Sequence, residues 1–481
     1  MNNGKKVATN IIWRFLESCG AQSVNFMVSI ILARLLEPEL YGTLALITVF
    51  TTIISLFIDL GLGTALIQKK ETDEIDFCSV FYFNIFSGLI LYFILFLCAP
   101  LIANFYNNSN LTIFIRVQSL ILIISSFKNI QYDYVAKNMI FKKFFFATLG
   151  GTITAAITGI WMAYNGFGIW ALIVQCLLNN FIDTIILWIT VKWRPKLLFS
   201  FTRIKELLKF GWKILTSALL ATGYEKIRQL IIGKQYSPQD LSFYDKGNHF
   251  PEFITNNINP AINSVLLPAM SKQQDDLIRL KEMTRKSLMT SAYLIMPLMM
   301  GLAVCSEPFT LLLLTEKWLP CVFYMRIFCY TYALSPINTA NINAIQSMGR
   351  SDIFLKLQII KTIIGIIAVL ATMFISVKAM ALSLFVSSTL CQLVNSWPNK
   401  KLLNYSYFEQ IKDLMPIVFI TIVMGSIVYC FSFLNLKPII LLLIQIPTGV
   451  LIYVILSKIF KIQSFNYLLS IIVSYFQKKK E

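Results

Sequence analysis

The sequence is short of charge, of histidine and of long polar stretches. Only 14% of its 481 residues are charged, and the single histidine is His249. The longest polar stretches, about 192–209 and 271–286, are too short to form a folded soluble domain. These absences exclude an ordinary soluble enzyme, and they leave no room for a nucleotide-hydrolysing domain within the chain.

Motifs for catalysis, nucleotide binding and metal binding are also missing. No Walker A, H-E-x-x-H or G-x-S-x-G pattern occurs, and the nine cysteines form no C-x-x-C pair. Several cysteines, such as Cys98 and Cys305, fall within apolar runs, which indicates buried free thiols rather than a disulfide or metal framework. The sequence therefore predicts no catalytic centre, no metal site and no cofactor.

Apolar residues are what the sequence has in abundance. Hydrophobic residues make up 57% of the chain and its mean hydropathy is +0.68, which is typical of a polytopic membrane protein. The formal charge of +18 could suggest a nucleic-acid partner. However, the cations punctuate apolar runs instead of forming a basic block in a polar domain, so we expect no nucleic acid.

Long apolar segments define the expected fold. A membrane-spanning helix needs about 20 largely apolar residues. The sequence predicts fourteen such segments, at about 8–33, 43–68, 77–104, 110–135, 145–164, 167–191, 208–233, 240–269, 286–314, 320–347, 353–376, 379–399, 411–434 and 438–460. The N-terminus lacks a cleavable signal pattern, so we expect the first segment to be retained. The predicted fold class is an all-α polytopic membrane protein.

Basic residues are distributed unequally between the two sets of connections. The termini and the loops after even-numbered segments carry 28 Lys and Arg residues, whereas the loops after odd-numbered segments carry 5. Basic loops stay on the cytoplasmic side of a membrane. This bias predicts that both termini are cytoplasmic, which requires an even number of spans.

The beginning of the chain recurs about 200 residues later. Residues 13–42 read WRFLESCGAQSVNFMVSIILARLLEPELYG, and residues 212–242 read WKILTSALLATGYEKIRQLIIGKQYSPQDLS. Arg14 in the first copy corresponds to Lys213 in the second. Each copy is a long, mostly apolar segment with a cation near its start and a proline-marked turn at its end. Such a repeat is how many transporters build a central site.

The repeat and the topology together predict three parts of the chain. Residues 1–205 form an N-terminal lobe of six spans, and residues 206–405 form a C-terminal lobe of six spans with the same orientation. Residues 406–481 add two spans and an amphipathic cytoplasmic tail. We expect the lobes to rock about the turns at Pro38 and Pro238.

Some charged residues fall within or near the predicted spans. A charge at the centre of a membrane helix costs about 2.5–3.5 kcal/mol, so such a group faces water or pairs with another charge. The cations are Arg14, Arg116, Lys128, Lys213, Lys226, Arg228, Lys246, Arg326 and Lys361. The acids are Glu17, Asp59, Asp183, Glu225, Asp245 and Glu252. We therefore expect a polar path through the protein.

Helical spacing suggests how some of these charges pair. Arg14 and Glu17 share a helix face and can form a structural ion pair. Alternatively, Arg14 and Lys213 both lie at the inner mouth of one cavity, because they occupy matching places in the repeat. Glu225 and Arg228 are the expected inward-facing pair of the seventh segment.

Two further positions leave alternatives open. Asp59 is expected to be neutral, to pair with Arg14 or to bind a coupling ion. Asp245 and His249 lie one turn apart at the start of the eighth segment, where His249 is either packed in the protein or part of a proton relay. That segment is rich in asparagine and carries Pro251 and Pro260, which predicts a bent helix that lines a cavity.

Four stretches resemble one known family. DLGLGTALIQKKE at 59–71, FYDKGNHFPEFITNNINPAINSVLLPAMSKQQDD at 243–276, EKWLP at 316–320 and MGRSD at 348–352 are similar to the Wzx-type polysaccharide flippases. The similarity is greatest to the branch that contains the colanic acid and teichuronic acid exporters. It runs through most of the chain and is weakest after about residue 405.

The resemblance implies a fold and a task. The fold is that of the multidrug/oligosaccharidyl-lipid/polysaccharide exporter superfamily, with two six-helix lobes around a cavity. The task is to move oligosaccharide repeat units linked to undecaprenyl diphosphate across the bacterial inner membrane by alternating access, without enzymatic chemistry. The implied partners are the lipid-linked oligosaccharide, the bilayer, and a polysaccharide polymerase with its chain-length machinery.

The resemblance also suggests roles for the charges within the spans. The candidate substrate-binding cations are Arg14, Lys213, Arg228 and Lys246. The candidate counter-ions or coupling acids are Glu17, Asp59, Glu225 and Asp245. The sequence leaves open whether the coupling ion is a proton or sodium. Two alternatives remain: a multidrug or cation exporter of the same superfamily, which would need an acidic or aromatic pocket, and a membrane-embedded polymerase, which would need a large outer loop.

Overall fold

A computed structural model describes residues 20, 22–69, 71–138, 140, 142–271, 273, 276–434, 436–467 and 469–470. The side chains of residues 260–269, 271 and 351 are not among those described. All regular secondary structure in these ranges is helical. By their contacts the residues fall into two compact units, Met1–Ser242 and Phe243–Glu481.

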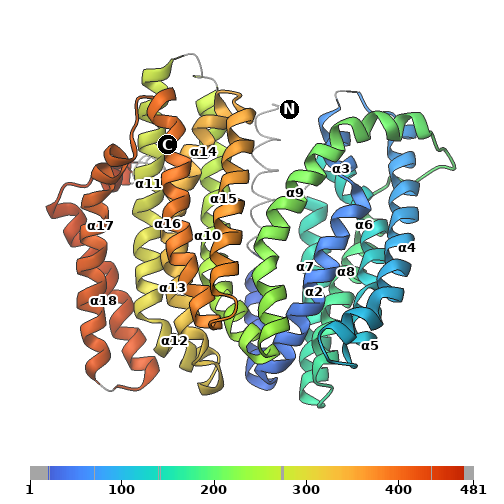
Figure 1. Cartoon of the computed structure of the whole chain (residues 1–481), viewed down its shortest axis with the longest axis horizontal. Coiled ribbons are helices and arrows are strands. Elements are labelled where there is room, and N and C mark those ends of the chain that lie inside the picture. The colour runs from blue at the N-terminus through green and yellow to red at the C-terminus, as the bar shows by residue number, and fades with distance from the viewer. Residues whose placement is uncertain are drawn as a thin grey trace, which may run out of the picture. The chain divides into compact units, whose positions relative to one another are not determined.

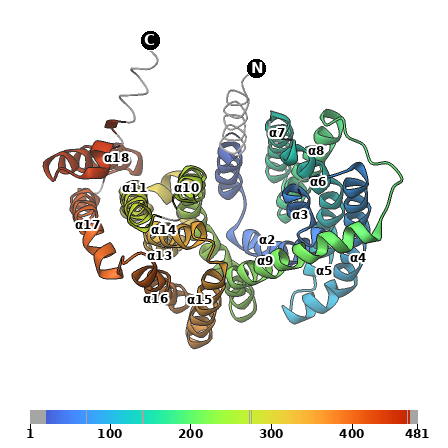
Figure 2. The ribbon, with the colours of Figure 1, turned by 90° about the horizontal axis from the view of Figure 1, so that it is seen from above.

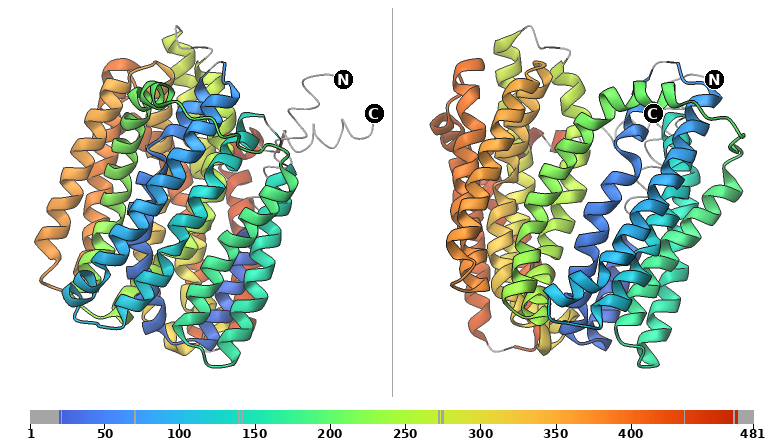
Figure 3. Two further views of the ribbon diagram at one scale, coloured as in Figure 1. Left: turned by 90° about the vertical axis from the view of Figure 1, so that its right-hand side faces the viewer. Right: turned by 45° about the vertical axis from the view of Figure 1, so that its right-hand side comes forward.

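The first unit begins with a helical stretch, Gln22–Leu35, followed by the helices that Figure 1 labels α2 to α9. These are α2 (Pro38–Asp59), α3 (Leu62–Gln68), α4 (Glu74–Phe105), α5 (Leu111–Gln118), α6 (Leu120–Lys137), α7 (Lys142–Tyr164), α8 (Ile169–Thr190) and α9 (Phe201–Gln235). Figures 1 and 3 show that α9 bends near its start. Helix α10 (Pro238–Ser271) starts at the end of this unit and continues into the second one.

The second unit contains the rest of α10 and a further bundle of helices, several of which are seen end-on in Figure 2. These are α11 (Leu277–Val304), α12 (Ser306–Leu313), η1 (Glu316–Trp318), α13 (Cys321–Ala333), α14 (Ser335–Ser347), α15 (Ser351–Thr372), α16 (Val377–Leu402), α17 (Tyr407–Cys430), η2 (Phe431–Leu434) and α18 (Pro438–Ile459).

The predicted all-α polytopic fold is confirmed. Within the described residues, 10 helical stretches are long and apolar enough to cross a membrane. Three other predicted spans coincide with the more polar α9 and α10 and with the pair α13 and α14. The predicted span 8–33 overlaps the helical stretch Gln22–Leu35, and its residues 8–19 and 21 lie outside the described residues. Large apolar side chains face outward on the spans; on α4, Phe93 is 59% exposed and Leu97 71%. Since lipid is as apolar as these side chains, the chain is a multi-pass membrane protein.

Small residues let the helices of the first unit approach closely. Helix α7 packs against α8 through Gly151, where a Cβ atom would lie 2.7 Å from the Asn179 carbonyl oxygen. Ala155 and Ala156 on the same helix are buried. Van der Waals contact between close backbones is a main source of helix association in lipid, where the hydrophobic effect is absent.

The predicted span 43–68 is interrupted in the structure. Helix α2 ends at Asp59, and Leu60 (φ 49°) and Gly61 (φ 74°) adopt left-handed conformations before α3 begins. The break receives the backbone of α9, because a Cβ atom on Gly61 would lie 2.6 Å from the Gly211 carbonyl oxygen. Glycine is therefore required at Gly61 by both its φ angle and this contact.

The two proline-marked turns of the repeat occur where the sequence places them. Pro38 opens α2 and Pro238 opens α10, each after a helix that ends a few residues earlier. The turns lie in contact, since a Cβ atom on Gly42 would lie 1.6 Å from the Pro238 carbonyl oxygen. The predicted lobe boundary at 205/206 stays a prediction. The repeat places α9 in the second lobe, whereas its contacts with α2, α3 and α4 group it with the first compact unit.

We predict that Gly42→Ala destabilises the protein. The new methyl group would overlap the Pro238 carbonyl, and overpacking of this kind costs about 1–3 kcal/mol. The matched control is Gly223→Ala on α9, where a Cβ atom meets nothing within 4 Å. Thermal unfolding in detergent should show a lower midpoint for Gly42→Ala and an equal or higher one for Gly223→Ala. Equal midpoints for Gly42→Ala and the unmodified protein would contradict the contact.

Candidate functional site

The predicted site residues fall on three helices and on the N-terminal segment. Asp59 ends α2, while Lys213, Glu225 and Arg228 lie on α9, all in the first unit. Asp245 and Lys246 lie on α10 in the second unit. Arg14 and Glu17 lie outside the described residues. Their predicted roles stay predictions.

Arg228 is a buried arginine whose hydrogen-bonding capacity is largely unused. The residue is 3% exposed, and its guanidinium carbon lies 5.6 Å from the centre of the Tyr224 ring. Among the described residues, no partner accepts a hydrogen bond from its Nε or Nη2 atom. Buried donors are normally satisfied, and a guanidinium presents paired donors that match carboxylate and phosphate oxygens. The arrangement therefore suits an anionic ligand.

The predicted pairing of Glu225 with Arg228 is wrong. Glu225 instead forms an ion pair with the adjacent Lys226, with 3.0 Å between Lys226 Nζ and Glu225 Oε1. Long side chains at neighbouring positions can fold back toward each other, so helical spacing alone did not settle this choice. Lys213 lies near the start of α9, two residues after the Gly211 contact with the α2–α3 break, and its side chain is exposed.

Helix α10 carries the polar residues that the sequence singled out. Lys246 is 6% exposed, and its Nζ atom lies 5.6 Å from the centre of the Trp318 ring. His249 packs edge-on against Phe250, and its Nδ1 atom is buried without a hydrogen-bond partner among the described residues. Glu252 accepts a hydrogen bond from Asn248 Nδ2 at 2.9 Å. The helix thus brings a buried cation, an imidazole and a carboxylate to consecutive turns.

Asp59 meets a second carboxylate that the sequence analysis missed. Both Asp59 oxygens accept the Gly63 N–H, at 2.9 and 3.0 Å. Asp133 on α6 lies against the same glycine, since a Cβ atom on Gly63 would lie 2.4 Å from Asp133 Oδ2. Asn84 on α4 is fully buried beside Asp59. Asp133 falls inside the predicted span 110–135, so its charge was the signal that could have identified it.

Asp183, another carboxylate of the first unit, is paired with a lysine. Lys128 Nζ lies 3.4 Å from Asp183 Oδ2 and donates a 2.8 Å hydrogen bond to Asn180 Oδ1. The two charged side chains are only 20% and 13% exposed. This pair joins α6 to α8, and it satisfies the requirement that a charge within lipid have a partner.

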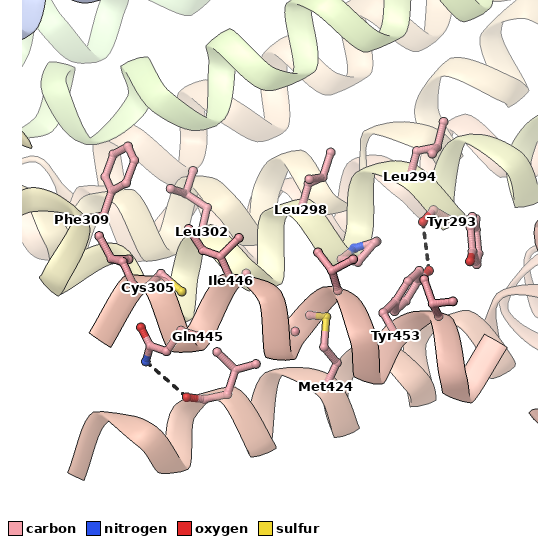
Figure 4. A pocket seen from close by; sticks show the side chains of 17 residues that line it. Tyr293, Leu294, Leu298, Leu302, Cys305, Phe309, Met424, Gln445, Ile446 and Tyr453 are labelled. Carbon is pink, nitrogen blue, oxygen red and sulfur yellow. Dashed lines mark hydrogen bonds between the residues drawn. The ribbon is translucent and has the colours of Figure 1, made fainter. Parts of the chain in front are cut away.

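An apolar groove runs along the second unit between α11, α12, α17 and α18. Its volume is about 500 Å³. Figure 4 shows Phe309 and Cys305 toward one end and Tyr293 and Tyr453 toward the other. The Tyr453 hydroxyl donates to the Tyr293 carbonyl at 2.9 Å, and Gln445 Nε2 donates to Ser432 Oγ at 3.0 Å, so these donors of the wall are occupied. The groove suits a hydrocarbon chain.

Ion pairs hold the polar linker before α9, and the first turn of α9, against the start of α4. Lys196 Nζ donates to the Glu74 carboxylate at 2.7 Å, and this hydrogen bond raises the pKa of Lys196. Arg203 Nη2 donates to Asp73 at 3.0 Å. Because these groups are exposed, each pair contributes little stability. Within the described residues, no group of three or more His, Cys, Asp and Glu side chains is arranged to hold a metal ion.

Comparison with known proteins identifies relatives in polysaccharide biosynthesis. The family described as "Polysaccharide biosynthesis protein" matches residues 31–323, more than half of the chain. The succinoglycan biosynthesis transport protein ExoT of Rhizobium meliloti (strain 1021) is 24% identical over 66% of this chain and 64% of its own length. The teichuronic acid biosynthesis protein TuaB of Bacillus subtilis (strain 168) is 25% identical over 64% of this chain and 63% of its own length. The chain thus matches just under two thirds of the length of these two relatives.

Longer matches and solved structures agree on the fold. The lipopolysaccharide biosynthesis protein WzxC of Escherichia coli (strain K12) is 22% identical over 86% of this chain and 83% of its own. The lipid II flippase MurJ in an inward closed conformation has a TM-score of 0.78 at 17% identity, over 93% of this chain and 98% of MurJ. An inward-facing multidrug resistance MATE family transporter has a TM-score of 0.61 at 14% identity, over 79% of this chain and 94% of the transporter.

We predict that Lys128→Met strongly destabilises the protein, because it leaves the Asp183 carboxylate buried without its cation. Breaking a buried ion pair costs about 3–5 kcal/mol. Replacing both partners, as Lys128→Met with Asp183→Leu, should restore most of the loss. Heat resistance of the monodisperse protein in detergent measures both effects. A double variant as unstable as the single one would show that the pair is not the source of the loss.

Proposed function

Since the chain belongs to the polysaccharide biosynthesis protein family, we propose that it is a flippase for lipid-linked oligosaccharides. The substrate is a repeat unit on undecaprenyl diphosphate, which moves from the cytoplasmic to the outer face of the bacterial inner membrane. Family membership and the names of the relatives ExoT, TuaB and WzxC support this proposal. The protein moves its substrate without breaking or forming covalent bonds.

The observation that carries the proposal is the guanidinium of Arg228, whose Nε and Nη2 donors find no acceptor among the described residues. A diphosphate loses its hydration when it leaves water, and paired N–H donors replace that hydration best. Arg228 is buried on α9 with donors to spare, and Lys213 lies on the same helix, exposed to an incoming headgroup. We assign the same headgroup-binding role to Lys246 and to Arg14, which is the repeat counterpart of Lys213.

The substrate's apolar tail requires a different surface from its headgroup. The groove between α11, α12, α17 and α18 offers about 500 Å³ lined almost entirely by apolar side chains. Because lipid is as apolar as this groove, the prenyl chain gains van der Waals contacts by seating there and not the hydrophobic effect. We assign this groove to the tail and the cations to the headgroup.

Transport then proceeds by alternating access, with the lobes 1–205 and 206–405 exposing the cations to one side of the membrane at a time. Both termini are cytoplasmic in this scheme, as the distribution of basic loops predicts. Glu17, Asp59, Glu225 and Asp245 serve as counter-ions or coupling acids. A polysaccharide polymerase with its chain-length machinery receives the product outside.

A drug exporter is a weaker alternative on chemical grounds. The fold is shared with MurJ and with MATE transporters, so the fold alone does not choose between their substrates. A cationic drug would be repelled by buried Arg228 and Lys246. Buried cations favour an anionic substrate, and no comparable observation favours a cationic one.

We predict that replacing Arg14 and Lys213 together with glutamine lowers the flipping rate by about tenfold or more, because each charge-assisted hydrogen bond contributes about 1.5–3 kcal/mol. Vesicles that contain the purified protein and a defined lipid-linked oligosaccharide measure the rate. The control is Lys378→Gln with Lys437→Gln, which removes the same charge from predicted outer loops. An unchanged flipping rate in the variant that lacks both Arg14 and Lys213 would contradict their role in binding the diphosphate.

We predict that Gly301→Leu impairs flipping of long-tailed substrates. Gly301 lines the groove, and a Cβ atom there meets nothing within 4 Å, so leucine fills space without a clash. Loss of about ten atom contacts, at about 0.1–0.2 kcal/mol each, costs about 1–2 kcal/mol, or roughly tenfold in affinity. A substrate with a shortened prenyl tail should be affected much less, and Gly301→Ala should affect neither. Equal inhibition of both substrates by Gly301→Leu would place the tail elsewhere.

A further inference from the structure

A basic pocket lies within the second unit, between the first turns of α11, the first turns of α17 and the end of α18. Its volume is about 300 Å³. The charged side chains that line it are Arg285, Lys412, Asp413 and Lys461. Three cations and one acid give these side chains a net charge of +2. None of them belongs to the headgroup site or to the apolar groove described above.

Asp413, the one acid of this basic pocket, is already bound. Its side chain is only 5% exposed, and its Oδ1 atom accepts a hydrogen bond from Arg285 Nη2. The Tyr405 hydroxyl donates to Asp413 Oδ2 at 2.8 Å. Arg285 thus balances the charge of this carboxylate, and both carboxylate oxygens have a donor. The charges of the two lysines are left uncompensated within the pocket.

Lys412 and Lys461 are exposed, and neither forms an ion pair within the ranges that the structure describes. Glu409, one turn before Lys412 on α17, pairs instead with Lys281 at 2.9 Å. Basic residues on this side of the chain are expected from the positive-inside bias alone. That bias does not require them to line one pocket beside an acid that is already satisfied.

The backbone of Lys461 is a second unusual feature of the pocket. Its φ angle is +48°, in the left-handed region that glycine normally occupies where a helix ends. Here α18 ends at Ile459, and the turn carries a lysine in place of a glycine. The left-handed turn gives the residue its place in the pocket wall, although it costs backbone energy.

The basic pocket continues the apolar groove along the same helices. Met289 in the pocket lies one turn before Tyr293 in the groove on α11. Phe460 in the pocket follows Val454 in the groove by six residues, or about 9 Å of helix. Tyr293 and Tyr453 therefore mark the end of the groove that is nearer to the pocket (Figure 4). Positive charge at one end and an apolar wall beyond it match a lipid with an anionic headgroup.

We propose that Arg285, Lys412 and Lys461 bind the phosphate of an anionic lipid whose chain enters the groove. The pocket lies among connections that are basic and therefore predicted to be cytoplasmic, and basic pockets between membrane helices on that side bind lipid headgroups. Two lipids share this chemistry: an anionic glycerophospholipid and the lipid-linked phosphate of the transport substrate. The second source rests on the proposed flippase function, whereas the phosphate site itself does not.

Native mass spectrometry of the delipidated full-length protein tests the proposal. The probes are phosphatidylglycerol and undecaprenyl phosphate, with zwitterionic phosphatidylcholine as a reference. Lys412→Gln with Lys461→Gln should bind both anionic probes about tenfold or more weakly, because charged donors to the phosphate are lost. Its affinity for phosphatidylcholine should not change. The two lysines are exposed and unpaired among the described residues, so the variant keeps the contacts of the fold.

The matched control is Lys400→Gln with Lys401→Gln. These lysines end α16 on the same side of the second unit, are exposed, and do not line the pocket. The control removes an equal charge and should bind both anionic probes like the unmodified protein. Inorganic phosphate, added as a competitor at the concentration of the lipid, should not displace it. Size-exclusion profiles establish folding, and the single variants Lys412→Gln and Lys461→Gln replace the double one where it does not fold.

Each outcome decides the proposal. Weaker binding of phosphatidylglycerol alone assigns the pocket to a glycerophospholipid, and weaker binding of undecaprenyl phosphate alone assigns it to the substrate. Weaker binding of both assigns it to lipid phosphates in general. Unchanged binding of both probes, an equal loss in the control variant, or displacement by inorganic phosphate overturns the proposal. A protein that shows the expected binding but moves no lipid-linked sugar would refute the flippase function and leave this site standing.

Discussion

A charge within a lipid bilayer needs a partner, water or neutralisation, and the polar residues of this protein are arranged by that constraint. Lys128 and Asp183 satisfy it by pairing with each other, with Asn180 as a further acceptor for Lys128. Glu225 and Lys226 satisfy it with each other. The first pair joins α6 to α8, the second lies within α9, and neither needs a ligand.

The incomplete cases are the informative ones. Within the part of the chain that the structure describes, the Nε and Nη2 donors of buried Arg228 have no acceptor, and the Asp59 and Asp133 carboxylates both lie against Gly63. Fold similarity to MurJ and MATE transporters supplies the scaffold, and these side chains carry the argument about substrate.

Close backbone contacts bring these groups together. Gly63 gives Asp133 access to Asp59, Gly61 and Gly211 let α9 touch the end of α2, and Gly42 receives the Pro238 turn. Each contact joins segments far apart in the sequence. Small residues at these positions let the backbones of different helices approach closely.

The sequence by itself determined the all-α polytopic architecture, the approximate positions of the spans and the family. Long apolar runs specify membrane helices locally, so α4, α7 and α18 lie within a few residues of their predicted limits. The family resemblance, drawn from stretches such as 59–71 and 243–276, is confirmed by the match over residues 31–323.

Only the tertiary structure decided which charges meet. It interrupted the second predicted span at Leu60 and Gly61, paired Glu225 with Lys226 instead of Arg228, and set Asp133 against Asp59. Hydropathy is a property of single segments, whereas a pair of charges on different helices depends on how those helices pack and rotate. Helix packing depends on contacts between residues that are far apart in the sequence. The local pattern of a single sequence does not specify how far apart such residues lie in space.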